Sequence, residues 1–373
     1  MHRIYWKIQA QIQEKKKSKK DRKSNINFFI MVDFSNPFDE FMKSNNWDTD
    51  RINDLARTIG KQSKSELLLN LNHLAVERLK EVIPFAAKFA DVPVKNLEQS
   101  ITQISVLDDL LINGYTWSPD GDHFNIEINV GLSVFCAQVA NVFISFIGRI
   151  DSSGQRRGNG LISKNEAASQ IKKLIQTYVA GQPYYELPSA ELERELMLFS
   201  VSLHGGIESF VVGHELGHVI ISVSKKGREF NQLAIGLMME QLVKIKSLEN
   251  PGELANQWGT EVAADLIGLM SILQEGPPDY YSAIELFFII CELLEEEKHI
   301  QDVLEIYNAY EAAGQDTHQL DALLKNKNPF LKTHPPAAMR LNFLRQLTEH
   351  FPEQMRLWGK EAEILGNEVL KVK

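Results

Sequence analysis

The residues best suited to chemistry in this chain are two histidines and a glutamate at positions 214–218, which read His-Glu-Leu-Gly-His. The surrounding residues 210–222 are largely apolar and predict a helix. Histidines four positions apart share one helix face, so His214 and His218 can both bind one zinc ion. Glu215 is too close in sequence to join them as a ligand, but it can take a proton from a zinc-bound water. The alternative is a pair of histidines on a buried helix flank.

A second set of candidates begins 43 positions after His218, in the sequence Glu261-Val-Ala-Ala-Asp265. Glu261 and Asp265 are four apart on one helix face, so Glu261 can supply a third zinc ligand and leave the fourth position open for water. Asp265 is placed to accept the free ring N–H of a ligating histidine, which fixes the tautomer of that ring. Gly268 continues the same face and would let two helices approach closely. The alternative is a pair of surface carboxylates, but unpaired charges are costly to bury in so apolar a segment.

The third set of candidates is His334 and Arg340, in the segment Thr-His-Pro-Pro-Ala-Ala-Met-Arg at 333–340. The residue before a proline favours extended backbone and proline is favoured in the first helical turn, so a helix should begin near Pro335. A histidine or arginine near the zinc can stabilise the oxyanion that forms when water attacks a carbonyl. Taken alone, the segment is better explained as a helix cap followed by a surface arginine.

The order of these motifs, H-E-x-x-H, then E-x-x-A-D, then T-H-P-x-x-x-x-R, resembles the gluzincin metallopeptidases of the CAAX-prenyl and heat-shock type. It is also similar to the bacterial phage-exclusion peptidase Lit. The motifs span residues 214–340, and three independent pieces in the same order make the match specific. The segment 122–148, with a strand before a helix, also looks like the corresponding region of the phage-exclusion peptidase. The resemblance implies three zinc ligands: His214, His218 and Glu261.

The resemblance also implies roles for the other motif residues. Glu215 would be the catalytic base and Asp265 the supporting acid, with His334 and Arg340 as catalytic residues of the closing motif. The CAAX-prenyl and heat-shock members are integral membrane enzymes, whereas this sequence lacks clear spanning helices. That departure favours a soluble intracellular peptidase that acts on a protein or peptide substrate. The target of the phage-exclusion type does not carry over, because shared zinc chemistry does not determine the substrate.

Composition and charge narrow the class of protein. At 373 residues the chain is long enough for one large domain or two ordinary ones. Residues 1–30 hold nine Lys/Arg and two acidic residues, a charge of +7, so a net charge of −9 leaves −16 on the rest. An acidic body argues against nucleic acid as the main partner. The two cysteines, Cys136 and Cys291, lie in apolar surroundings, which favours buried free thiols in a reducing cytoplasm.

We expect three regions along the chain. Residues 1–30 predict a basic disordered tail without the apolar core of a secretory signal, and a nucleic-acid or membrane-surface arm is the alternative. Residues 31–150 should form a helix and sheet region. Residues 151–373 should form a helical zinc-binding region, which can make one domain with residues 60–150.

One apolar stretch has the length of a membrane-spanning helix. Residues 128–148 contain no charged side chain over 21 positions. Asn129, Gln138 and Asn141 interrupt this stretch, and residues 122–130 alternate like a strand. We therefore expect a strand that runs into a buried helix, and no other segment that approaches spanning length. Membrane association is not expected.

The spacing of apolar residues predicts an α+β fold, with a small N-terminal mixed sheet and a larger helical half that carries the H-E-x-x-H helix. The resemblance to gluzincin peptidases implies that this fold is zincin-like. Expected strands occupy 101–106, 114–117 and 124–130. Expected helices occupy 65–90, 132–148, 164–179, 189–222, 228–247, 253–273, 278–296, 300–313 and 335–347. Pro84 should kink or break the first helix. The acidic run at 295–297 reads as a solvated helix end, and His204 as a structural histidine rather than a residue of the cleft.

These observations lead to one hypothesis and two alternatives. The hypothesis is a zinc-dependent endopeptidase with one zinc per chain, in which Glu215 removes a proton from the zinc-bound water and delivers it to the leaving amine. An edge strand from residues 114–130 would hold an extended peptide substrate. The first alternative is a non-catalytic binding or regulatory protein whose structural zinc has a fourth ligand such as His334. The second is a defence or toxin peptidase that stays silent until a partner triggers it.

Overall fold

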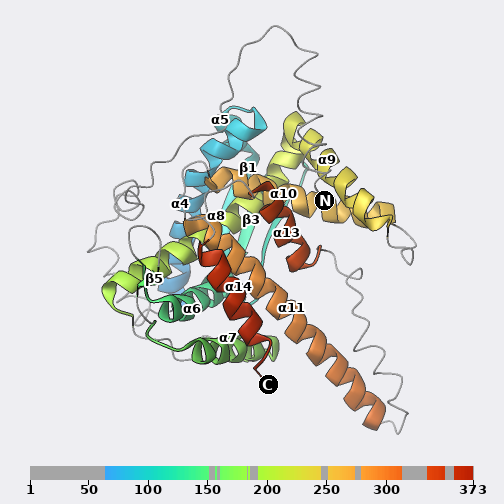
Figure 1. Cartoon of the computed structure of the whole chain (residues 1–373). Coiled ribbons are helices and arrows are strands. Elements are labelled where there is room, and N and C mark those ends of the chain that lie inside the picture. The colour runs from blue at the N-terminus through green and yellow to red at the C-terminus, as the bar shows by residue number, and fades with distance from the viewer. Residues whose placement is uncertain are drawn as a thin grey trace.

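The computed structural model describes residues 64–150, 156–157, 160–182, 184, 192–244, 251–273, 279–312, 334–348 and 357–372. The basic tail expected at 1–30 and the start of the region 31–150 lie outside the described residues. Within them, helices surround a small sheet (Figure 1). One hydrophobic core contains residues from Leu71 to Val369, so elements on both sides of the expected boundary at residue 150 share it.

A three-stranded mixed sheet lies beside the helix that carries the first motif. Its strands are β1 (Ile101–Leu107), β2 (Gly114–Trp117) and β3 (Phe124–Asn129), in the order β1-β3-β2. The central strand, β3, pairs in parallel with β1 and antiparallel with β2. The expected strand bounds are confirmed to within one residue, and so is the α+β class with a small mixed sheet. β2 forms an edge of this described sheet.

Helices make up most of the described chain, and their bounds are α4 (Lys64–Ala90), α5 (Val94–Ser100), α6 (Val130–Ile147), α7 (Lys164–Val179), α8 (Arg194–Val223), α9 (Lys225–Leu242), α10 (Pro251–Leu273), α11 (Asp279–Ala312), α13 (Ala337–Leu347) and α14 (Leu357–Val369). Two short strands, β4 (Arg149–Ile150) and β5 (Arg156–Arg157), form a separate antiparallel pair. Figure 1 shows α11 as a long helix whose far end extends away from the sheet.

Three expectations about the helices are wrong. α4 continues through Pro84, so the expected break there is wrong, while the expected kink stays a prediction. α11 is one helix where we expected two, because Glu297 is no solvated helix end: it is 6% exposed and pairs with Lys172 of α7 at 2.7 Å. The ion pair removes the cost of burying that carboxylate and lets the helix run on. α5 and α14 were not expected.

The expected strand that runs into a buried helix is confirmed, because β3 ends at Asn129 and α6 begins at Val130. The expectation that no other segment approaches spanning length is wrong. Both α6 and the part of α8 from Leu196 to Val223 are long and apolar enough to cross a membrane by length and composition. Most of each helix is buried inside the fold, as in core helices, so this finding is weak evidence for a membrane.

Buried polar side chains link α8 to two neighbouring helices at a distance from the motif. Glu208 of α8 accepts a 2.6 Å hydrogen bond from Ser133 of α6 and lies 3.2 Å from the ring nitrogen of His204. Burial raises the pKa of Glu208, but His204 and Arg78 of α4 outweigh burial and lower it to about 2. Gly205 leaves room for the guanidinium, since a Cβ there would lie 2.6 Å from Arg78 Nη2. His204 therefore holds a structural position beside Glu208, as expected.

The backbones of α8 and α10 are in direct contact. A Cβ on Gly217 would lie 2.8 Å from Ala264 Cα, and a Cβ on Gly268 would lie 2.8 Å from His214 N. Both distances are shorter than ordinary van der Waals contact, so any larger residue must push the helices apart. As the spacing of Gly268 indicated, this contact sets how close α10 comes to the first motif.

We predict that Gly268→Ala separates α8 from α10 and lowers the free energy of unfolding by about 1–3 kcal/mol. The matched control is Gly236→Ala in α9, where a Cβ meets nothing within 4 Å and the position is exposed. That variant should gain about 0.5–1 kcal/mol, because alanine favours a helix interior over glycine. Urea unfolding measures both. Equal stability of the two variants would show that the close contact is not required.

Candidate metal centre

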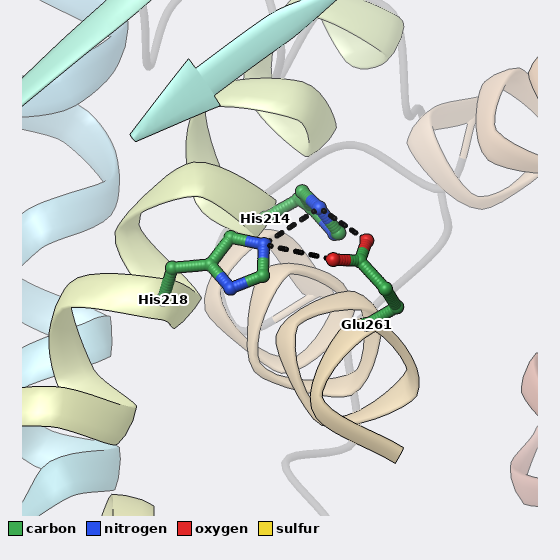
Figure 2. A group of neighbouring side chains, drawn as sticks. All are labelled: His214, His218 and Glu261. Atoms are coloured by element: carbon green, nitrogen blue, oxygen red, sulfur yellow. Dashed lines mark hydrogen bonds and ion pairs between the residues drawn. The ribbon is translucent and has the colours of Figure 1, made fainter. Parts of the chain in front are cut away.

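Two histidines of α8 and one glutamate of α10 converge on one point (Figure 2). His214 Nε2 lies 3.2 Å from His218 Nε2. Glu261 places Oε2 3.5 Å from His214 Nε2 and Oε1 3.7 Å from His218 Nε2. The structure thus brings Glu261 to the two histidines that the motifs give as zinc ligands with it, although Glu261 lies 43 positions beyond His218 in the sequence.

The spacing of these atoms fits a zinc ion. Ligand atoms about 2.0–2.1 Å from one tetrahedral zinc lie about 3.4 Å from each other, close to the three distances above. Glu261 Oε2 is also buried and accepts no hydrogen bond from the described residues. A buried carboxylate oxygen beside imidazole nitrogens in this way is suited to a cation between them. Imidazole and carboxylate ligands suit zinc, although manganese or cobalt would bind such a set too.

The buried Asp265 holds the first ligand in orientation. Its Oδ1 lies 2.9 Å from His214 Nδ1, and Asp265 itself is 1% exposed. With Nδ1 donating to this carboxylate, Nε2 of His214 is left free as a metal ligand. Sequence spacing had given Asp265 this role.

Arg340 of α13 binds the same carboxylate. Its Nε and Nη2 donate to Asp265 Oδ2 and Oδ1 at 2.7 and 2.6 Å, and its guanidinium lies 5.0 Å from the centre of the Phe288 ring. The expectation was an arginine that stabilises a reacting oxyanion. The bidentate contact instead favours a positioning role, because the charge is directed at Asp265.

His334 lies just before α13, at the outer side of the candidate ligands. Its Nε2 is 3.3 Å from Glu261 Oε2, and the side chain is 54% exposed. α13 begins two residues later than expected, at Ala337, whose N–H donates to Glu295 of α11 at 3.3 Å. His334 therefore reaches the cluster through the carboxylate of Glu261 and remains open to a molecule in the cleft.

The electrostatics of the cluster favour a cation. Burial lowers the pKa of His214, but the neighbouring carboxylates of Asp265 and Glu261 outweigh burial and raise it to about 10. Burial and the neighbouring His214 lower the pKa of His218 to about 4, so this ring is neutral at neutral pH. Burial also raises the pKa of Glu261, yet the histidines outweigh burial and bring it well below its usual range. Carboxylates that favour a proton on His214 favour a divalent ion in the same place.

Glu215 is buried beside the ligands and contacts the edge strand. Thr116 of β2 donates to Glu215 Oε2 at 2.9 Å, and burial raises the pKa of this glutamate. Gly114 of the same strand lets β2 lie close to α8, since a Cβ there would lie 3.0 Å from Ile128 Cδ1 and 3.3 Å from Val211 Cγ1 of α8. Sequence reasoning did not find Thr116. The alternation of β2 shows only that one of its faces is turned inward, not which helix that face meets.

A cleft of about 1500 Å³ contains the cluster. Its walls come from β2 and the loop before it, from α8, from α11 and from the start of α13. Two tyrosine hydroxyls fix that loop: Tyr184 donates to Leu110 O at 3.2 Å, and Tyr178 accepts from Ile112 N at 3.1 Å. All seven site residues expected from the motifs except Asp265 line this cleft: His214, Glu215, His218, Glu261, His334 and Arg340.

We predict that Asp265→Asn weakens zinc binding by about 10–100-fold, because the amide no longer provides a charged acceptor for His214. The matched control is Glu285→Gln in α11. Glu285 is also 1% exposed and bound to an arginine, with Arg345 Nε at 2.7 Å, but it does not line the cleft. Competition with a zinc-binding dye measures both. The prediction fails if the two variants lose zinc affinity equally.

No family model, no curated protein and no solved structure matches this chain. The likeness to gluzincin peptidases therefore depends on the three sequence motifs. The distances among His214, His218 and Glu261 then carry the chemical argument for the site.

Proposed function

We propose that this protein is a zinc-dependent endopeptidase with a zincin-like catalytic region of the gluzincin type. The observation that carries the proposal is the arrangement of His214, His218 and Glu261 at the spacing of three zinc ligands, with Glu215 buried beside them in a large cleft. Three protein ligands leave one coordination position for water or substrate, as catalytic zinc sites require.

When bound, zinc supplies a Lewis acid that polarises a peptide carbonyl and makes water more acidic. Glu215 then acts as the base that accepts the proton of the attacking water and passes it to the leaving amine. Thr116 donates to one oxygen of that carboxylate at 2.9 Å and so orients Glu215, which lines the cleft. Asp265, held by Arg340, keeps the His214 ring in position throughout.

The cleft can hold a stretch of polypeptide. Its volume of about 1500 Å³ exceeds the roughly 300–1000 Å³ of typical small-molecule sites. β2 lines it and lies at the edge of the described sheet, so an extended peptide can add to this strand through backbone hydrogen bonds. This arrangement would place a scissile bond near Glu215. We propose an unfolded segment or exposed loop of a protein as the substrate, with no role for nucleic acid.

We propose a cytoplasmic location, on the basis of the two cysteines. Cys136 and Cys291 are both free, as expected in a reducing compartment. The buried faces of α6 and α8 are used within the fold, which supports a protein that does not depend on a membrane.

The rival function, a binding protein with structural zinc, requires a fourth protein ligand. Within the described residues, the group whose ligand atoms lie within 4.8 Å of one another holds only His214, His218 and Glu261. His334 contacts Glu261 and is more than half exposed, so it does not close the site in this arrangement. Glu215 would also have no task in a closed structural site.

We predict that Glu215→Gln keeps about one zinc per chain but loses hydrolysis of an unfolded protein substrate by about 10²–10⁴-fold. The control is Glu208→Gln, which alters a buried carboxylate of the same helix away from the ligands. That variant should lose stability but keep its activity per folded molecule. Full activity of Glu215→Gln would show that the assigned base is wrong. A zinc-loaded wild type that cleaves nothing would favour the triggered peptidase.

A further inference from the structure

The cleft contains an apolar recess beside the metal-ligating residues. We define the recess by five residues from three parts of the chain that line the cleft together: Ile112, Leu132, Phe287, Cys291 and Leu294. Phe287, Cys291 and Leu294 follow one another at i, i+4 and i+7 along α11, so they form one stripe of that helix. The residues that define the recess carry no charged group.

The recess begins next to the first ligand. Phe210 of α8 lies one turn before His214 and also lines the cleft. Its ring centre is 6.5 Å from that of His214 and 6.0 Å from that of Phe287. When a substrate binds at the metal ligands, a side chain close to its reacting carbonyl can therefore reach this apolar wall.

The recess has free space behind it. A second cavity of about 10 Å³ lies on the far side of Ile112, Phe287, Cys291 and Leu294, which line both spaces. Its remaining walls are apolar, from Phe135, Cys136, Val139, Ile207 and Ile290. A cavity this small and apolar stays dry, and it lets the four shared side chains move without displacing water.

Most charged side chains of the α11 wall lie beyond the recess. Lys298, Asp302 and Glu305 line the cleft about one to three turns beyond Leu294. Glu295 lies at the border, next to Leu294, where it accepts from Ala337 N. A charged substrate side chain would find partners there, whereas in the recess it would lose hydration without compensation. The division of the cleft thus sorts side chains by polarity.

We propose that the recess is the specificity pocket of this peptidase and that it binds a bulky aliphatic or aromatic side chain adjacent to the scissile bond. The inference rests on the proposed zinc-peptidase function. Cys291 sets the size of the pocket, because it is the smallest side chain of the α11 stripe and stands between Phe287 and Leu294. Burial of the guest side chain supplies the selectivity.

The test uses zinc-loaded protein and three hydroxamate chelators that carry a methyl, an isobutyl or a benzyl side chain. Calorimetry measures their affinities, so no turnover is needed. The isobutyl and benzyl compounds should bind at least about tenfold more tightly than the methyl compound, as expected for extra apolar groups in a matched pocket. Equal binding of all three would overturn the pocket alone. Binding of none would overturn the zinc function on which it rests.

Two variants of Cys291 test the size of the pocket from opposite directions. Cys291→Met fills the recess and should cut the preference for the benzyl over the methyl compound by about tenfold. Cys291→Ala enlarges the recess and should keep or increase this preference. Leu304→Met is the control, since Leu304 is on α11, 52% exposed, and outside the cleft. If both Cys291 variants match the control, Cys291 does not set the size of the pocket.

Discussion

The contact between the backbones of α8 and α10 is the constraint on which the rest of the site depends. With Gly217 against Ala264 and Gly268 against the backbone of His214, the two helices lie close enough for Glu261 to reach both histidines. Side chains at these positions would hold α10 away, and the ligands would no longer converge. The sheet and the outer helices pack around these two helices and leave one side of them open to the cleft.

Ion pairs around Asp265 stabilise the same arrangement of helices. Burial of Asp265 is costly unless its charge is compensated, and Arg340 and His214 both compensate it. α13 is thereby tied to α10 through Arg340, while Glu295 of α11 caps its first turn. The closing motif of the sequence acts, on this geometry, mainly as a support that fixes the ligand ring, with His334 left at the mouth of the cleft.

Local sequence patterns predicted the features that depend on neighbours in the chain. Residue pairs four apart were placed on single helix faces, and β2 and α7 were given their observed bounds. Features that depend on distant residues were missed. The ion pair that accompanies burial of Glu297 within α11 joins it to Lys172, 125 positions away, and the Thr116 contact with Glu215 spans 99 positions. A single sequence carries no local signal for such pairs, so only the packed structure reveals them.

The central claim is that three side chains from two helices bind one zinc ion. Metal analysis by mass spectrometry on purified protein tests it directly, with wild type measured beside Glu261→Ala. We expect about one zinc per wild-type chain, largely lost in the variant, because two histidines alone hold the ion weakly. A well-folded wild type without zinc would contradict the claim, and a binding role for this cleft would then explain the site better.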